Sequence, residues 1–242
     1  MNAQRGLLYL AIAIVFASIA GAWAIVNRNA QAQAISVVGL GQKDFESDLI
    51  VWQGDFAREG MQLQEAYAQL QRDRKATEEF LLAKGIRREE IQFSAVSIQR
   101  LYTTDYDQLG RMQSQRFAGF RLVQTVRVES KDLDRVEGVS RDIAELISRG
   151  VEFNSGVPQY FYTKLDSLKI ALIEAATADA RRRAETIART AGGSLGALQS
   201  ATLGVFHITE RNSSEELEWG GTFNTTARLK TARVTVRLRY RL

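Results

Sequence analysis

Residues 164–191 read KLDSLKIALIEAATADARRRAETIARTA, and their apolar and small side chains follow a helical repeat. The positions that recur at steps of three or four are Ile173, Ala176, Ala180, Ala184, Ile187 and Ala191. This spacing predicts one long amphipathic helix from about Lys164 to Ala191, because residues three and four apart share a helix face. The many small residues on that face predict close packing of the helix onto a sheet.

The residues that follow this helix predict a strand for such a sheet. Val234, Val236, Leu238, Tyr240 and Leu242 alternate with Arg233, Thr235, Arg237, Arg239 and Arg241 in the segment Ala232–Leu242. A period of two is typical of a half-buried strand. We expect the apolar face in the core, and the arginine face towards solvent, anionic lipid headgroups or a neighbouring subunit.

The rest of the chain predicts further strands and two more helices. The predicted strands are Ile35–Leu40, Leu49–Phe56, Ile91–Tyr102, Phe117–Glu129, Val151–Tyr162 and Ala197–Thr209. Helices are expected at Glu59–Lys84, ending at Gly85, and at Leu133–Ser148, between Asp132 and Gly150. We expect the first two strands to pair as a hairpin, residues 103–115 to form an exposed hairpin loop, and Pro158 to mark a strand edge or irregularity. The predicted fold class is α+β, with mainly antiparallel sheets packed by long helices.

The N-terminal segment predicts a membrane anchor. Residues 6–26 (GLLYLAIAIVFASIAGAWAIV) carry no charge, and a helix of this length spans roughly 30 Å, the thickness of a bilayer core. Trp23 lies near one end, as an interfacial residue does. We therefore expect residues 1–5 as a cytoplasmic stub, 6–26 as a transmembrane helix, 27–33 as a polar linker and 34–242 as the folded domain. The alternative is a signal peptide cleaved near Ala32 or Ala34, since small residues alternate there.

Composition excludes several classes of function. The chain has no cysteine, which removes disulfides, thiolate nucleophiles and a lipidated cysteine. Its net charge is +4, and the basic residues are spread along the chain, so we expect no nucleic-acid partner.

Few residues suggest catalysis. His207 is the only histidine, and one histidine without cysteine is a poor zinc donor set. Asp179 and Glu185 are six residues apart on the long helix, which separates their carboxylates and favours ion pairs with neighbouring arginines. The segment Gly39-Leu40-Gly41 lacks the third glycine and the helix of a dinucleotide site. We expect no catalytic residue, no cofactor and no metal.

The best candidates for a contact surface are aromatic and basic. Trp219 and Phe223 lie in an otherwise hydrophilic loop, and Arg237, Arg239 and Arg241 lie on one face of the last strand.

Three segments resemble the SIMPL (DUF541) family of bacterial envelope proteins. They are the opening ISVVGLG at residues 35–41, the run from Lys84-Gly85-Ile86 to Ile91-Gln92, and the helix from Ala178-Asp179-Ala180 to Leu195-Gly196. One departure is Phe45-Glu46-Ser47-Asp48, where family members commonly carry Pro-Asp. The resemblance implies an envelope location and no established catalytic residues.

The hypothesis that follows is a non-enzymatic protein of the inner membrane, single-pass, with its domain in the periplasm. It acts as a structural or interaction module, self-associating as a homo-oligomer, in envelope integrity or stress tolerance. The alternatives are a periplasmic ligand-binding module released by cleavage, and an envelope hydrolase, which lacks a plausible set of catalytic groups.

Overall fold

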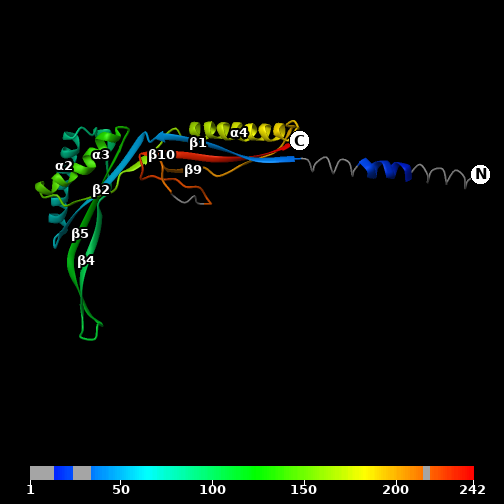
Figure 1. Ribbon diagram of the computed structural model, residues 1–242. Helices are drawn as coiled ribbons and strands as arrows, with labels where there is room; N and C mark the ends of the chain where they lie inside the picture. Colours follow the sequence, from blue (N-terminus) through cyan, green and yellow to red (C-terminus); the bar gives the residue numbers. More distant parts are fainter. Residues whose placement is uncertain (1–13, 24–33, 215–218) are drawn as a thin grey trace, which may run out of the picture.

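The structure is a computed structural model that describes residues 14–23, 34–214 and 219–242 (Figure 1). Residues 14–23 form a helix whose side chains are all exposed. Within the described ranges, no helix combines the length and the apolar character needed to cross a bilayer. The predicted transmembrane helix at 6–26 lies largely outside the described residues.

The folded domain has ten strands and three α-helices among these residues. In chain order they are β1 (Ala34–Glu46), β2 (Leu49–Gly60), α2 (Leu63–Ala83), β3 (Ile91–Phe93), β4 (Ser97–Tyr106), β5 (Met112–Ser130), α3 (Leu133–Asp142), β6 (Phe153–Ser155), β7 (Gln159–Phe161), α4 (Leu165–Thr190), β8 (Leu198–Leu203), β9 (His207–Glu210) and β10 (Leu229–Arg241). Short 3₁₀ helices cover Arg88–Glu90 and Ile143–Arg149. The predicted α+β class with antiparallel sheets is confirmed.

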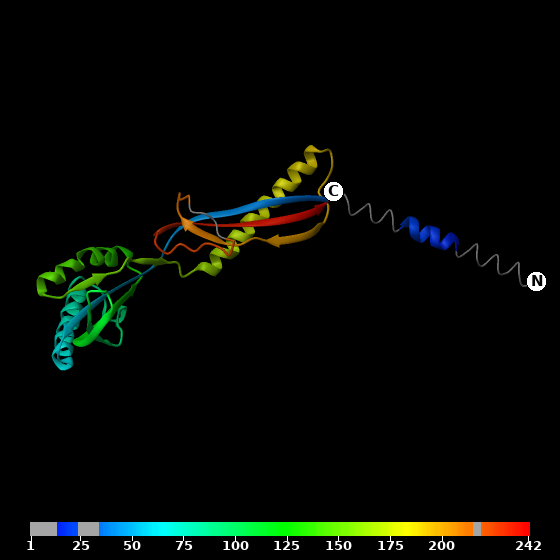
Figure 2. The same ribbon diagram turned by 90° about the horizontal axis from the view of Figure 1, so that it is seen from below.

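The strands form two separate sheets, which divide the domain into two lobes (Figures 1 and 2). In the first sheet β10 lies between β1 and β8, and β9 also pairs with β10. Helix α4 lies along this sheet, and together they form what we call the α4 lobe. In the second sheet the order is β3-β5-β2-β6, with β4 added to β5 and β7 to β2. Helices α2 and α3 pack on it, forming the α2 lobe.

The α4 lobe is packed through small residues, as the sequence predicts. Leu168, Leu172, Ala176, Ala180, Ala184 and Ala188 are the buried residues of α4. A Cβ atom on Gly39 of β1 would overlap the carbonyl oxygen of Ala176 and would lie 2.7 Å from the Cβ of Ala180. The absence of a side chain at Gly39 therefore lets the helix backbone approach the sheet backbone. The predicted stripe is wrong at Ile187 and Ala191, which are exposed, and Ile173 is only partly buried.

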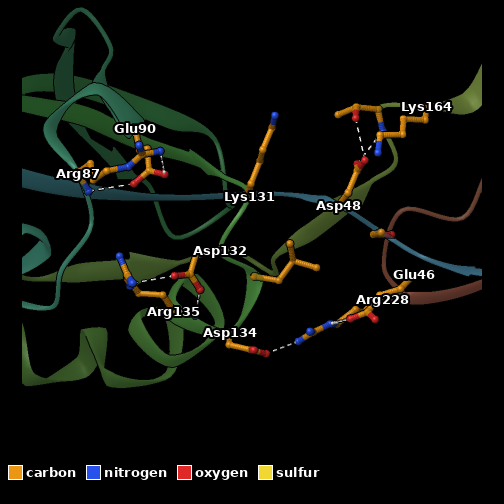
Figure 3. A pocket seen from close by; sticks show the side chains of 13 residues that line it. Glu46, Asp48, Arg87, Glu90, Lys131, Asp132, Asp134, Arg135, Lys164 and Arg228 are labelled. Atoms are coloured by element: carbon orange, nitrogen blue, oxygen red, sulfur yellow. Dashed lines mark hydrogen bonds and ion pairs between the residues drawn. The ribbon is translucent and has the colours of Figure 1, made fainter.

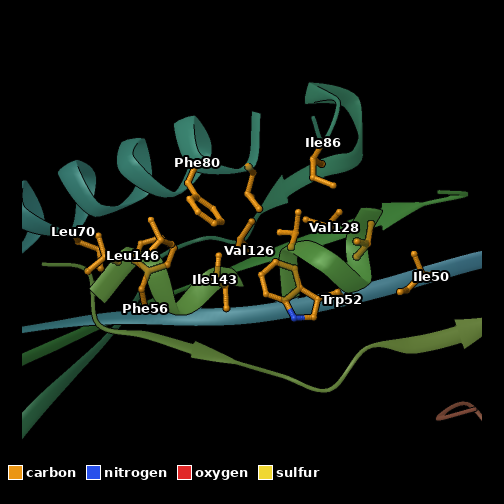
Figure 4. Close-up of a cluster of buried hydrophobic side chains, with 14 of the residues drawn as sticks. Ile50, Trp52, Phe56, Leu70, Phe80, Ile86, Val126, Val128, Ile143 and Leu146 are labelled. Carbon is orange, nitrogen blue, oxygen red and sulfur yellow. The ribbon is translucent and has the colours of Figure 1, made fainter. Parts of the chain in front are cut away.

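The α2 lobe is packed through large side chains (Figure 4). Trp52 and Phe56 of β2 and Phe80 of α2 are each at most 1% exposed. Helix α2 begins at Leu63, not at Glu59, because β2 continues to Gly60. Gly85 adopts a φ of +86° after its end, as expected of a glycine stop.

The predicted hairpin between the first two strands is wrong. Strand β1 pairs with β10, whereas β2 pairs with β5, so the two belong to different sheets. Two hydrogen bonds hold the connecting residues: Ser47 N donates to the Arg228 carbonyl, and Asp48 N donates to the Phe161 carbonyl. The chain thus passes from one lobe to the other without turning back.

Three other predicted strands are divided in the structure. Ile91–Tyr102 splits into β3 and β4, Val151–Tyr162 splits into β6 and β7 around Pro158, and Ala197–Thr209 splits into β8 and β9. The expected loop at residues 103–115 is shorter than predicted, since β4 continues to Tyr106 and β5 starts at Met112. The helix predicted at Leu133–Ser148 changes to 3₁₀ geometry after Asp142, and the Asp132 side chain caps its start by accepting from Arg135 N.

Candidate functional site

A cavity of about 730 Å³ lies where the two lobes meet, and ten of its lining residues are charged (Figure 3). Arg228 lies between the lobes. Its guanidinium donates to Glu46 at 2.6 Å and to Asp134 at 2.5 Å, and these carboxylates keep the pKa of Arg228 above its ordinary value. Glu46 belongs to β1 and Asp134 to α3, so this arginine joins the lobes.

A second ion pair in the same cavity belongs to the α2 lobe. Glu90, 8% exposed, accepts from the Arg87 guanidinium at 2.8 Å and from the Ser130 hydroxyl at 2.7 Å. The Arg87 bond, helped by Ser130, lowers the pKa of Glu90 to about 2 against the opposing effect of burial. A carboxyl group whose pKa lies this far below neutral pH is a poor general acid or base. Arg228 therefore links the two lobes, whereas the Arg87–Glu90 pair lies within the α2 lobe at the same cavity.

Lys230 is a buried cation in the α4 lobe, next to this joint. It is 1% exposed, and its Nζ donates to the carbonyl oxygens of Tyr160 and Asn224, at 2.6 Å each. Burial lowers its pKa to about 8. The Phe223 ring lies 5.5 Å from the ammonium group, in cation-π geometry.

The structure places the predicted contact residues at separate positions. Trp219 is fully exposed and, with Leu40, Val205, His207 and Arg233 among others, lines a second cavity of about 390 Å³. Phe223 packs instead over Lys230. Arg237, Arg239 and Arg241 are exposed further along β10, on the face opposite the buried side chains. The five residues therefore do not converge on one site.

The arginine face borders exposed apolar side chains. Arg237 is opposite Val38 of β1 in the strand register, and Val38 is 43% exposed. Leu40, 44% exposed, is opposite Thr235. Helix α4 covers the other face of the sheet, where Leu238 and Val236 are buried.

The helix carboxylates are paired with arginines, as predicted. Asp179 lies 2.8 Å from Arg183 Nε, and Glu185 lies 2.8 Å from Arg181 Nε. Asp179 also accepts from the backbone N–H of Leu40 at 3.1 Å, and this bond and Arg183 lower the Asp179 pKa. Because β1 is an edge strand, Asp179 satisfies one backbone donor on that open edge. This contact could not be predicted from the sequence, because it joins residues far apart in the chain.

The segment Gly39-Leu40-Gly41 serves packing. Both glycines face α4 closely, and a Cβ on Gly41 would lie 3.1 Å from Ala176 N. His207 lies on β9, with its Nδ1 3.5 Å from the Thr222 hydroxyl. Among the described residues, no group of three His, Asp or Glu side chains is arranged to hold a metal ion.

Strands β4 and β5 form a long two-stranded arm, here residues 97–119, that extends away from both helices of its lobe (Figure 1). Tyr102 and Phe117 lie opposite each other on it and are 52% and 41% exposed, with ring centroids 6.0 Å apart. Leu109 and Met112 at its tip are 75% and 66% exposed. This aromatic surface was not predicted, because Tyr102 and Phe117 lie on either side of the hairpin loop expected at residues 103–115.

These features define a two-lobed α+β protein whose prominent elements are a charged joint, an exposed arm and an open basic sheet face. The chain belongs to the SIMPL family: the family model described as "Protein of unknown function (DUF541)" matches residues 35–240. The match covers both lobes and confirms the resemblance stated from the sequence. No curated protein matches the chain.

Proposed function

We propose that the protein is a non-enzymatic, membrane-anchored module of the bacterial envelope that works by self-association. The observation that carries the self-association is the arm. A two-stranded ribbon is marginally stable alone in water, and this one exposes the facing rings of Tyr102 and Phe117 and the apolar side chains of Leu109 and Met112 at its tip. Burial against a second copy would stabilise it.

Open strand edges support the same proposal. Among the described strands, β4 pairs only with β5, and β1 pairs only with β10, so each leaves one edge unpaired. Equivalent edges on two copies can pair by backbone hydrogen bonds, which is how symmetric oligomers often form. Envelope integrity or stress tolerance is the role we assign to such an assembly.

Two observations support the anchor. Residues 6–26 are uncharged and long enough to cross a bilayer. Residues 14–23, where they are described, expose Ile14, Phe16 and Trp23 by 58% or more. Apolar helices left uncovered by protein are stable in a lipid environment.

The test of self-association is the mass of the full-length protein in mild detergent, measured by light scattering. The double variant Tyr102→Thr, Phe117→Thr removes the exposed rings and keeps residues that favour strands. We expect the wild type to form a discrete oligomer and the variant to fall to a smaller species.

The matched control is Tyr67→Gln, Leu82→Gln, which changes two exposed side chains of α2. It should leave the mass unchanged. An oligomer that persists unaltered in the arm variant contradicts assembly through the arm.

The Trp219 cavity favours the second candidate, a periplasmic ligand-binding module released near Ala32 or Ala34. Its lining is mainly apolar with a few polar groups, as ligand pockets are. A compound screen that raises the melting temperature of the wild type but not of Trp219→Ala would favour this candidate.

A further inference from the structure

One end of the α4 lobe concentrates the positive charge of the molecule. We define this arginine end as residues 34–41, 179–203 and 234–242. Strand pairing brings the first and last segments together, from Ala34 opposite Arg241 to Gly41 opposite Val234. Strand β8 pairs with β10 at the same end, and the Leu40–Asp179 hydrogen bond ties in α4.

The charge at this end exceeds that of the whole chain. It holds seven of the 32 Lys and Arg residues and only two of the 28 Asp and Glu residues, a net charge of +5 where the chain has +4. The rest of the chain is therefore close to neutral, at −1. Arg181 and Arg183 pair with the two carboxylates, whereas Arg237, Arg239 and Arg241 are exposed and have no ion pair within the described part of the chain.

Exposed apolar side chains lie at the same end of the lobe, on both faces of its sheet: Val38 is opposite Arg237, whereas Leu203 is opposite Val236, on the face that α4 covers. Val38, Ile187, Leu198 and Leu203 are 43–52% exposed, and all belong to the arginine end. A groove of about 540 Å³ between β1 and α4 is lined by Ser36, Val38, Arg182, Arg183 and Ile187, among others. Basic groups mixed with exposed apolar groups are typical of surfaces that bind at the lipid headgroup layer.

The N-terminal segment is joined to the domain at this same end. Strand β1 starts at Ala34, so the seven linker residues 27–33 separate the arginine end from the anchor proposed above. Seven residues span at most about 25 Å. A domain held this close to a bilayer has its basic end within reach of the lipid phosphates.

We propose that the arginine end binds anionic phospholipid headgroups of the membrane that carries the anchor, and so fixes the domain with the arm pointing away from its attachment. The proposal rests on the proposed anchoring for its biological setting. Its chemistry depends only on the arginine end.

The test uses residues 34–242 without the anchor. This fragment keeps both hydrophobic cores, because they draw only on residues from Ile35 onwards, and the side chains of residues 14–23 are exposed. The fragment is mixed with vesicles of phosphatidylcholine alone or with 30% phosphatidylglycerol, a composition chosen at roughly the anionic level of bacterial membranes, and then sedimented. We expect binding only to the anionic vesicles, and its loss at high salt.

The test variant is Arg237→Gln, Arg239→Gln, Arg241→Gln. Removing three arginines from an anionic surface should weaken vesicle binding on the order of a hundred-fold. The matched control is Arg72→Gln, Arg141→Gln, Arg211→Gln, which removes the same charge from exposed positions outside the arginine end and outside the arm. The control should bind like the wild-type fragment.

Three outcomes would overturn the proposal: no binding to anionic vesicles, equal loss in both triple variants, or dimerisation through this end without vesicle binding. Circular dichroism of each variant verifies that it is folded. The result is independent of the anchor, which is tested separately on the full-length chain, so a failure here and a failure of anchoring are distinguishable.

Discussion

The two lobes both lay helices on antiparallel sheets, yet they fill the interface in opposite ways. In the α2 lobe, Trp52, Phe56 and Phe80 occupy the space between helix and sheet. In the α4 lobe, Gly39 and Ala176 bring the two backbones almost into contact. The first arrangement depends on side-chain volume and the second on its absence. They should therefore be sensitive to opposite kinds of substitution.

The largest effect is expected from truncation in the α2 lobe. Trp52 is fully buried, stacks on Phe153 and donates from Nε1 to the Ser155 hydroxyl and the Gly156 carbonyl, at 3.1 Å each. Trp52→Ala should lower the free energy of unfolding by about 3–5 kcal/mol in urea titrations. Trp219→Ala, at a fully exposed position, should change it by less than about 0.5 kcal/mol. Equal effects would mean that the buried ring does not support this core.

The next effect concerns the buried charge of the α4 lobe. Burial lowers the pKa of Lys230 from 10.5 to about 8, so between these values the unfolded chain binds the proton and the folded chain does not. The free energy of unfolding should therefore rise with pH from about 8 to 10.5, by up to roughly 3 kcal/mol. Lys230→Met should remove this rise relative to the wild type. If the difference in free energy of unfolding between the two proteins does not vary with pH, burial does not lower the pKa of Lys230.

Enlargement in the α4 lobe tests the close helix contact. Gly39→Ala should lower the free energy of unfolding by about 1–3 kcal/mol, because the new Cβ meets backbone atoms of α4. The same change at Gly138 in α3, where no atom lies within 4 Å of the added Cβ, should raise it by roughly 0.5–1 kcal/mol. Chemical denaturation of both variants shows whether the free energy of unfolding falls for the first and rises for the second. A tolerated Gly39→Ala contradicts backbone contact.

The smallest effect belongs to the buried carboxylate of the α2 lobe. The pKa of Glu90 is lowered to about 2 from 4.5, so its stabilisation is present above pH 4.5 and is lost as pH falls towards 2. We expect a loss of about 1–2 kcal/mol over this range, allowing for the exposed Arg87 partner. Glu90→Gln should flatten the acid limb of the stability profile. If the variant loses as much free energy of unfolding at low pH as the wild type does, other carboxylates cause that loss.

The sequence predicts the local elements of both lobes better than their pairing. The long helix α4 and the alternation of β10 as far as Tyr240 depend on neighbours in the chain, and both are confirmed, whereas the predicted buried positions Ile187 and Leu242 are exposed. The prediction of a β1–β2 hairpin is wrong because it relied on the two strands being adjacent in the chain. The hydrogen-bond partners of Ser47 and Asp48 instead lie more than a hundred residues away. Arg228 and Lys230 were missed as joint residues for the same reason. Residues 103–115 are mostly polar, so the sequence predicted a loop where β4 and β5 in fact continue into the arm. The exposed aromatic residues of the arm lie on either side of that segment.

The proposed anchored assembly is tested most directly by intact mass spectrometry and light scattering on one sample of the protein purified from membranes in mild detergent. An anchored assembly predicts a discrete oligomer whose chains retain residues 1–26. A monomer that begins at Gln33 or Ile35 would contradict both the anchor and the assembly.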